Sequence, residues 1–173
     1  MRIREYEHEN DFEIIKDWIT DERTHTMWCA GRTPFPLQKE SFGKLLSDIL
    51  INNGDRPFVA VDDNETAEGF FCCSLNDPAH EGFLKFIMVD PEKRGIGLGK
   101  EMLRLAVRSF FETSDAKAVQ LMVFSVNERA KKCYEGIGFK VRKKEDNALL
   151  FEDEAWARYN MVITRNDFKK DKQ

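Results

Sequence analysis

The stretch from Phe83 to Phe111 constrains the fold more than any other part of this sequence. Its first part, Phe83 to Val89, is almost continuously apolar, which predicts a strand buried on both faces. Asp90-Pro91 ends that strand, because proline has no N–H to offer a strand ladder. Apolar residues then recur at helical spacing from Leu98 onwards. The segment is therefore predicted to form a strand, a tight turn and a helix.

Three glycines at alternate positions, Gly95, Gly97 and Gly99, separate the strand from the helix. Without a Cβ, backbone N–H groups can come close to a ligand and turn toward it together. The first N–H groups of a helix lack partners within the helix and lie at its positive end, a combination that binds phosphate. Arg94 adds a cation with a planar fork of donors. The sequence therefore predicts a phosphate cradle at the start of this helix.

Two better-known glycine motifs do not fit this loop. The dinucleotide pattern G-x-G-x-x-G needs a glycine where the chain has Lys100, and the P-loop needs a glycine at Arg94 and Ser or Thr at Glu101. These mismatches disfavour a nucleotide-binding domain of either kind. A strand–helix corner that binds no ligand is the alternative interpretation of the glycine loop taken alone.

Composition limits the class of protein. A length of 173 residues predicts one domain, and a net charge of −4 argues against nucleic acid as the main partner while it suits a cationic substrate. No apolar run is long enough to span a bilayer, and the charged start MRIREYEHEN predicts no secretion signal. The cysteines lack metal-ligand spacing, so we expect no metal, and reduced thiols in a cytoplasmic protein. They are Cys29, Cys72, Cys73 and Cys133.

The remaining segments predict helices early in the chain and strands later. That order indicates a mixed sheet with helices on both faces, in one domain over residues 1–165 followed by a frayed tail from Asn166 to Gln173. The expected strands are Arg2 to Glu7, Pro57 to Val61, Ala67 to Leu75, Ala118 to Phe124, Phe139 to Arg142 and Trp156 to Thr164, and the expected helices are a first one through Phe12 and Trp18 and a second from Gln38 to Ile51, with an irregular stretch from Asp21 to Pro36.

A second informative stretch runs from Asn127 to Phe139. Asn127 and Tyr134 are two helical turns apart, so they share one face of the short helix that Asn127 is expected to open. The stretch fills every fixed position of the pattern N-x-x-A-x-x-x-Y-x-x-x-G-F.

Together, the two motifs resemble the cofactor site of the GNAT superfamily of acyl-CoA-dependent N-acyltransferases. The pyrophosphate loop of that family has the pattern [R/Q]-x-x-G-x-[G/A], which Arg94, Gly97 and Gly99 fill here. The close resemblance covers Glu81 to Phe139, about a third of the chain. It implies a mixed α/β fold of three layers: a mostly antiparallel sheet with a central splayed pair of parallel strands, and helices on both faces.

The resemblance also implies how acetyl-CoA would bind, without a metal. The pantetheine arm would enter the gap between the splayed strands, and Asn127 would hold it. Tyr134 would face the thioester sulfur as general acid, which suits a phenol because it can protonate the leaving thiolate. The backbone of Ile87, Met88 and Val89 would pair with the pantetheine, and the diphosphate would lie on Arg94, Gly95, Ile96, Gly97, Leu98, Gly99 and Lys100.

The transfer chemistry requires two further groups. A backbone N–H, expected at Val89, would stabilise the thioester oxyanion. The amine must attack uncharged, and for a lysine-like pKa of about 10.4 deprotonation at neutral pH costs about 4.6 kcal/mol, so a base is expected. Glu81 is the candidate, because a strand glutamate at the same offset before the loop arginine is the base in the histone-acetyltransferase branch. A solvated carboxylate at a strand end is the alternative, and His80 and His25, both expected on exposed loops, are rival bases.

Other side chains carry weaker predictions. Cys133 could form a covalent acyl intermediate, but it lies on a different helix face from Tyr134 and has no evident histidine partner, so packing is the favoured role. Aromatic residues before the second helix could line an acceptor pocket or pack in the core, and acidic residues could attract a cationic amine or simply be solvated. The aromatic residues are Trp18, Trp28 and Phe35, and the acidic ones are Asp21, Glu22 and Asp77.

The sequence thus predicts an N-acetyltransferase that moves an acetyl group directly from acetyl-CoA to a primary amine. Small-molecule amines, aminoglycosides, polyamines and protein N-termini are all open as acceptors, and no nucleic acid or membrane partner is expected. The alternatives are a larger acyl donor and a catalytically inactive CoA-binding sensor or interaction module. The oligomeric state is open, with a homodimer as one option.

Overall fold

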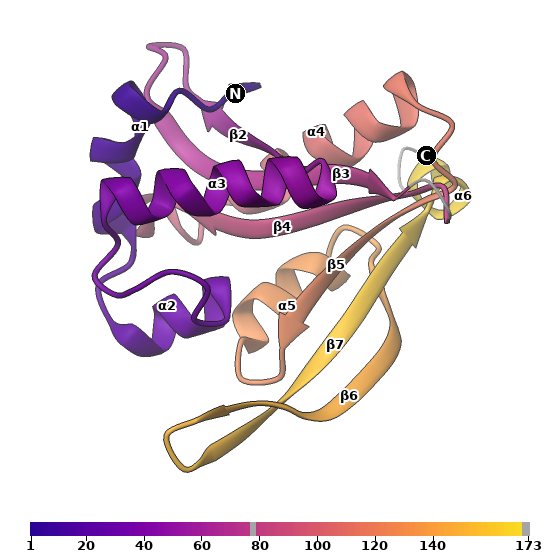
Figure 1. Ribbon diagram of the computed structural model, residues 1–173. Coiled ribbons are helices and arrows are strands. Elements are labelled where there is room, and N and C mark those ends of the chain that lie inside the picture. The colour runs from indigo at the N-terminus through magenta and orange to yellow at the C-terminus, as the bar shows by residue number, and fades with distance from the viewer. Residues whose placement is uncertain (77–78, 171–173) are drawn as a thin grey trace.

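The computed structural model describes residues 1–76 and 79–170 (Figure 1). One mixed sheet contains seven strands in the order β1-β2-β3-β4-β5-β7-β6. The elements along the chain are β1 (Arg2–Glu5), α1 (His8–Ile15), η1 (Lys16–Trp18), α2 (Glu22–Cys29), α3 (Lys39–Asn53), β2 (Arg56–Val61), β3 (Ala67–Asn76), β4 (Glu81–Val89), η2 (Pro91–Lys93), α4 (Leu98–Thr113), β5 (Ala118–Phe124), α5 (Glu128–Glu135), β6 (Lys140–Phe151), β7 (Glu154–Thr164) and α6 (Arg165–Lys170).

The central strands β4 and β5 form the one parallel pair of this sheet. Their pairing begins at Glu81 opposite Ala118 and ends at Leu84 opposite Leu121. Beyond that point β4 continues to Val89 without a partner on its β5 side. The predicted fold class and its splayed central pair are therefore confirmed, and the split exposes the backbone of the second half of β4.

A β-bulge in β4 lies next to the split. In the pairing with β3, Lys85 lies opposite Cys72 and Met88 lies opposite Phe70. Three steps along β4 therefore match two along β3, so two residues of β4 face one of β3. Phe86, inside the bulge, has φ +52°. The bulge exchanges the two faces of the strand: Leu84 packs in the core beside α4, whereas Phe86 and Met88 pack in the core on the opposite face.

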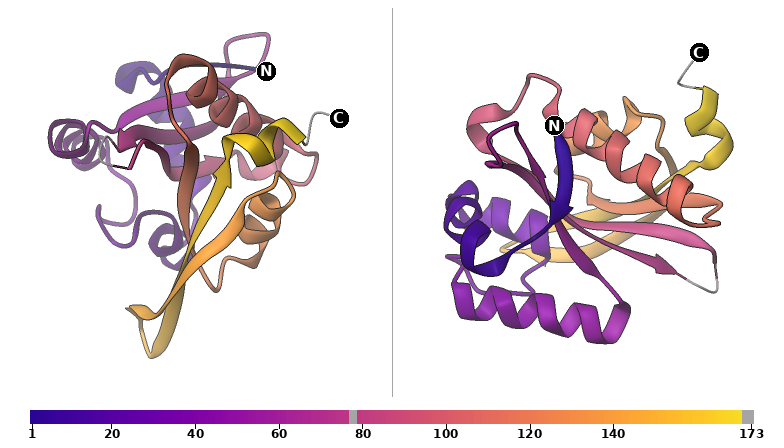
Figure 2. Two further views of the ribbon diagram at one scale, coloured as in Figure 1. Left: turned by 90° about the vertical axis from the view of Figure 1, so that its right-hand side faces the viewer. Right: turned by 90° about the horizontal axis from the view of Figure 1, so that it is seen from above.

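Helices cover the sheet on both faces (Figure 2). On one face, α1, α2 and α3 pack their apolar residues against β2 and β3, with Phe42 and Phe70 at the centre of that core. On the other face, α4 and α5 pack against β4, β5 and β7. The predicted apolar side of α4 is buried as expected, with Met102, Leu103 and Val107 almost inaccessible to solvent.

The prediction of an irregular stretch from Asp21 to Pro36 is wrong for residues 22–29, which form helix α2. Asp21 caps this helix by accepting a hydrogen bond from the Thr24 N–H at 2.7 Å. A helix of this length has little stability of its own, so its formation depends on the cap and on packing. His25 and Cys29 supply that packing, since both are buried.

The last strands also differ from the sequence prediction. Most of the segment between the expected strands Phe139 to Arg142 and Trp156 to Thr164 belongs to β6, which pairs with β7 as a long hairpin projecting beyond the rest of the sheet (Figure 1). The predicted frayed tail is helical in its described part: α6 covers residues 165–170, and Phe168 is buried against the core. Within residues 1–76 and 79–170, no helix is long and apolar enough to cross a membrane.

Candidate active site

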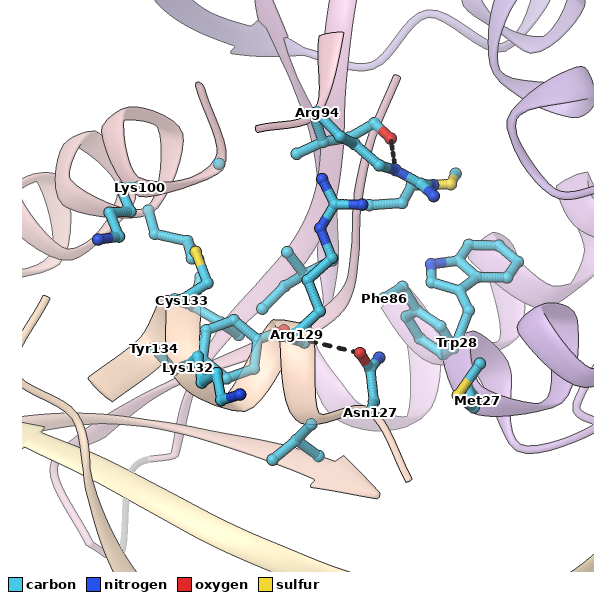
Figure 3. A pocket seen from close by; sticks show the side chains of 18 of the residues that line it. Met27, Trp28, Phe86, Arg94, Lys100, Asn127, Arg129, Lys132, Cys133 and Tyr134 are labelled. Carbon is cyan, nitrogen blue, oxygen red and sulfur yellow. Dashed lines mark hydrogen bonds between the residues drawn. The ribbon is translucent and has the colours of Figure 1, made fainter. Parts of the chain in front are cut away.

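A cavity of about 640 Å³ opens where β4 and β5 separate (Figure 3). The glycine loop and α5 line one side of it, and α2 with the bulged part of β4 lines the other. Ile96 and Leu98 do not line it: Ile96 is 78% exposed and Leu98 is buried elsewhere. The other predicted cofactor residues do line it: Ile87, Met88, Val89, Arg94, Gly95, Gly97, Gly99, Lys100, Asn127 and Tyr134.

The glycine loop has the backbone conformation that an anion cradle needs. Gly95 and Gly97 have φ of +92° and +94°, in the left-handed region that glycine alone adopts at little cost. Gly97 is the N-cap of α4 and provides no capping side chain, so the first N–H groups of the helix are left without internal partners. A Cβ placed at either glycine would meet no protein atom within 4 Å, so the space in front of the loop is open.

Four cations line the side of the cavity near the loop. Arg94 donates from Nε to the Val89 carbonyl oxygen at 3.1 Å, which orients its guanidinium at the end of β4. Burial lowers the pKa of Arg94, and the charge of Arg129 lowers it further. Lys100 and Lys132 complete the set. Excess positive charge of this kind favours a bound anion, and Arg129 and Lys132, three residues apart on α5, were not part of the sequence prediction.

The bulge at Phe86 is the strained element of the site. A bulky residue with positive φ is costly, and such strain persists only where the surroundings hold it. Trp28 of α2 packs edge-on against the Phe86 ring at 5.8 Å between centroids, and the Arg32 guanidinium lies 5.5 Å from the ring centroid. The sequence prediction missed this feature, because neither a glycine nor a proline marks it.

Tyr134 of α5 lies in the cavity wall beneath the split. Burial raises the pKa of its phenol above the ordinary value, so the hydroxyl stays protonated at neutral pH. In the described part of the chain no hydrogen bond to the protein engages that hydroxyl, which leaves its proton available. Asn127, one end of the same helix, accepts from the Ala130 N–H at 3.2 Å through Oδ1, so its amide NH₂ is the part free to meet a ligand.

Glu81 does not join the other predicted residues. It lies at the paired end of β4, five residues before Phe86, a distance of roughly 16 Å along a strand. Arg142 donates to both of its carboxylate oxygens, at 2.7 and 3.1 Å, and Gln120 donates to Oε2 at 2.8 Å. The structure therefore places Glu81 in an ion pair outside the cavity, and its role as base stays a prediction.

Neither rival histidine lines the cavity. His80 is exposed and its Nδ1 lies 3.3 Å from Asp115, near Glu81. His25 is 2% exposed inside α2, so the expectation of an exposed loop was wrong for it, and burial lowers its pKa. Among residues 1–76 and 79–170, no Asp, Glu or His contributes to the cavity lining. The described lining therefore offers neither a carboxylate nor an imidazole as a base.

Of the residues with weaker sequence predictions, some line the cavity and others do not. Cys133 lines the cavity, but burial raises the pKa of its thiol, which disfavours a nucleophilic thiolate. Trp28 lines the cavity, whereas Trp18 is part of the core and Phe35 packs against it. Asp21 caps α2, Glu22 is exposed on it, and Asp77 lies outside the described residues. No cluster of metal-binding side chains occurs in the part of the chain that the structure describes.

Comparisons with known proteins agree with this geometry. A family model described as the acetyltransferase (GNAT) family matches residues 7–139. A 5-NmdU N-acetyltransferase of Pseudomonas phage PaMx11 is 34% identical over 129 residues, which cover 74% of this chain and 87% of the relative. An aminoglycoside N(6')-acetyltransferase type 1 of Klebsiella pneumoniae is 24% identical over 174 residues, covering 94% and 82%.

A solved structure gives the same fold. The spermidine N-acetyltransferase from Vibrio cholerae, in complex with CoA and spermine, superposes with a TM-score of 0.79 over 97% of both chains, at 18% identity.

Proposed function

Because this chain belongs to the GNAT family of acetyltransferases, and is therefore an acetyl-CoA-dependent N-acetyltransferase, we propose that its cavity carries out direct transfer to a primary amine in a ternary complex. The observation that carries the proposal is the placement of the glycine loop and Tyr134 on the walls of a single cavity at the split of β4 and β5. In such a complex both substrates must be present together, because the one cysteine in the described lining, Cys133, has a raised pKa and is a poor nucleophile to hold the acetyl group.

Acetyl-CoA would be held by its charged and polar parts. The diphosphate would take the N–H groups at the start of α4 and the positive charges of Arg94 and Arg129. The pantetheine would pair with backbone groups of β4 that β5 leaves free. These features support the assignment because each offers hydrogen-bond donors or acceptors that the protein does not satisfy itself.

The protein would assist the reaction at two atoms. The Tyr134 hydroxyl would donate its proton to the leaving sulfur, and the high pKa that burial gives the phenol keeps that proton in place. Backbone N–H groups of the second half of β4, including that of Val89, would stabilise the oxyanion. Because the described lining contains no carboxylate or imidazole, we propose that a water molecule takes the amine proton. Glu81 is the alternative base, and a loss of kcat/KM in Glu81→Gln that shrinks as the pH rises would identify it.

The test is release of CoA thiol from acetyl-CoA in the presence of a panel of amines, with mass spectrometry of the acetylated product. Amine-dependent thiol release with an acetylated amine supports transfer. Binding of CoA without product from any amine would favour the inactive CoA-binding module.

The free cysteines of the structure fit the predicted cytoplasmic location, where thiols stay reduced.

A further inference from the structure

The acceptor side of the cavity lacks negative charge. Apart from Lys85, its lining consists of apolar side chains and one threonine, drawn from the residue after η1, from α2, from the bulge of β4 and from β5. We infer that the acceptor is an amine on an apolar, aromatic body with no second positive charge; this inference rests on the proposed transfer reaction. The residues of this side are Ile19, Thr24, Met27, Trp28, Phe86 and Met122.

The carboxylates close to this side already have hydrogen-bond partners within the protein. Asp55 is 0% exposed and accepts from the Lys85 ammonium with both oxygens at 2.7 Å, so it neutralises the one lysine that lines the cavity there. Asp21 accepts from the N–H and the hydroxyl of Thr24, both at 2.7 Å. A substrate ammonium group would therefore find no unpaired carboxylate in the lining.

In the proposed ternary complex, the phosphates of CoA take up the positive charge at the loop end of the cavity. Arg94, Arg129, Lys100 and Lys132 are all lining residues. Compensation for the further ammonium groups of a polyamine would therefore have to come from the acceptor side, whose described lining holds no carboxylate, and burying such a charge without a partner is costly. A single amine can lose its proton before attack and so avoids the penalty, whereas the remaining charges of a polyamine cannot all be removed.

Trp28 supplies an unpaired hydrogen-bond donor on the acceptor side. Its Nε1 is buried without a hydrogen-bond partner in the described chain, and the indole faces the cavity beside Phe86 (Figure 3). An indole N–H can only donate, so it suits an oxygen of the ligand and offers nothing to an ammonium group. Trp28 and Phe86 also present ring surfaces on which an aromatic body can pack.

The experiment compares tryptamine and 2-phenylethylamine with spermidine and kanamycin as acceptors at fixed acetyl-CoA. We expect kcat/KM to be at least tenfold higher for the two aromatic monoamines, because the described lining gives the further ammonium groups of the other two amines no carboxylate partner. Calorimetry on the CoA-saturated protein measures binding of the same amines independently of transfer.

The outcomes separate this inference from the proposed function. Transfer to spermidine or kanamycin as efficient as transfer to the monoamines overturns the inference and leaves the transferase function intact. Tighter binding of the monoamines without any transfer supports the inference and contradicts the proposed transfer. If none of the four amines is acetylated and the monoamines bind no more tightly than spermidine, the inference is wrong.

A gain-of-function variant tests the charge argument directly. Met122 lines the acceptor side and is 41% exposed, so a polar side chain can replace it with little strain on the core. The spermidine-to-tryptamine ratio of kcat/KM should be at least tenfold higher in Met122→Glu than in the uncharged variant Met122→Gln, which has nearly the same size. Equal ratios in the two variants, with CoA affinity retained, would show that charge on this wall does not select the acceptor.

Discussion

The guanidinium of Arg142 donates two hydrogen bonds to the carboxylate of Glu81, from Nη1 to Oε1 at 2.7 Å and from Nη2 to Oε2 at 3.1 Å. Gln120 and Asn160 extend this contact, because Arg142 donates to the side-chain oxygens of both, at 2.9 and 2.7 Å. The four side chains come from β4, β6, β5 and β7, so the network ties four strands together at the end where β4 and β5 are paired. Paired, planar contacts of this kind hold both partners in one orientation.

The first prediction concerns Glu81→Gln. If Glu81 serves this network, the variant loses the charge of the ion pair and the free energy of unfolding should fall by about 1–3 kcal/mol, measured by chemical denaturation. The pH profile of kcat/KM should match that of the unmodified protein. A loss of kcat/KM near neutral pH that shrinks as pH rises toward the pKa of the amine would instead identify Glu81 as the base.

A matched variant separates the two roles. Arg142→Gln removes the partner of Glu81 and leaves the carboxylate in place, so it should destabilise the protein by a similar amount. A base role predicts an altered pH profile in Glu81→Gln with a smaller change in Arg142→Gln, whereas a purely structural role predicts the same profile in both.

The second prediction concerns the glycine loop. Gly97→Val forces a β-branched residue into φ +94° and places its side chain in the open space before the loop, so the Kd of CoA should rise at least tenfold, about 1.4 kcal/mol. Gly54→Val is the control, because Gly54 caps α3 at φ +68° with equally open surroundings and lies outside the cavity lining. Calorimetry should show unchanged CoA affinity in the control; an unchanged Kd in folded Gly97→Val would contradict the phosphate assignment.

The third prediction concerns Tyr134→Phe, which removes only the hydroxyl. We expect kcat to fall about 10- to 1,000-fold while CoA affinity holds, because the proton donor to the leaving thiolate is lost. Tyr159→Phe, on β7 outside the cavity lining, should leave kcat unchanged. If kcat of Tyr134→Phe stayed within twofold of the unmodified protein, solvent or another group would have to protonate the sulfur.

Tyr134 also sets an expectation for the alkaline limb of the pH profile. Burial raises its pKa above the ordinary value of about 10, so the folded protein keeps the phenol protonated beyond that pH. Activity should therefore show no loss from ionisation of Tyr134 below about pH 10. A fall in kcat at a markedly lower pH that disappears in Tyr134→Phe would show that the phenol ionises more easily than its burial implies.

The fourth prediction concerns the contact between α2 and the β6–β7 hairpin. Arg23 donates to Glu154 at 2.6 Å and its guanidinium lies 5.0 Å from the Trp156 ring centroid. Because the next turn of α2 lines the acceptor side, Arg23→Ala should raise the KM of the acceptor severalfold and leave the Kd of CoA unchanged. Lys16→Ala, which breaks an exposed pair with Glu13, is the control and should change neither constant. Equal effects on acceptor and CoA would indicate general destabilisation instead.

The parts of the site that the sequence predicted well are those whose geometry is local. Gly95 and Gly97 adopt positive φ because the turn before α4 requires it, and the residues that make the cradle are neighbours in the chain. Asn127 and Tyr134 share a face of α5 because helical geometry sets their spacing. The order of apolar segments was enough to indicate a mixed sheet with helices on both faces.

The parts that were missed depend on contacts between distant segments. Helix α2 is short, and its stability comes from its Asp21 cap and from aromatic neighbours such as Phe35 rather than from a periodic apolar face. The length of β6 follows from its pairing with β7, which the charged residues of β6 gave no reason to expect.

The sequence by itself determined the chemistry that short segments carry: a glycine loop that opens a helix beside an arginine, and a tyrosine two turns after a capping asparagine. These need only local backbone geometry and residue spacing. Only the tertiary structure decided that Glu81 lies in an ion pair outside the cavity while Trp28 and Met122 form its acceptor side. The reason is the register of the central strands: pairing stops after Leu84 and the bulge at Phe86 exchanges the faces of β4, and no pattern within the strand itself encodes either event.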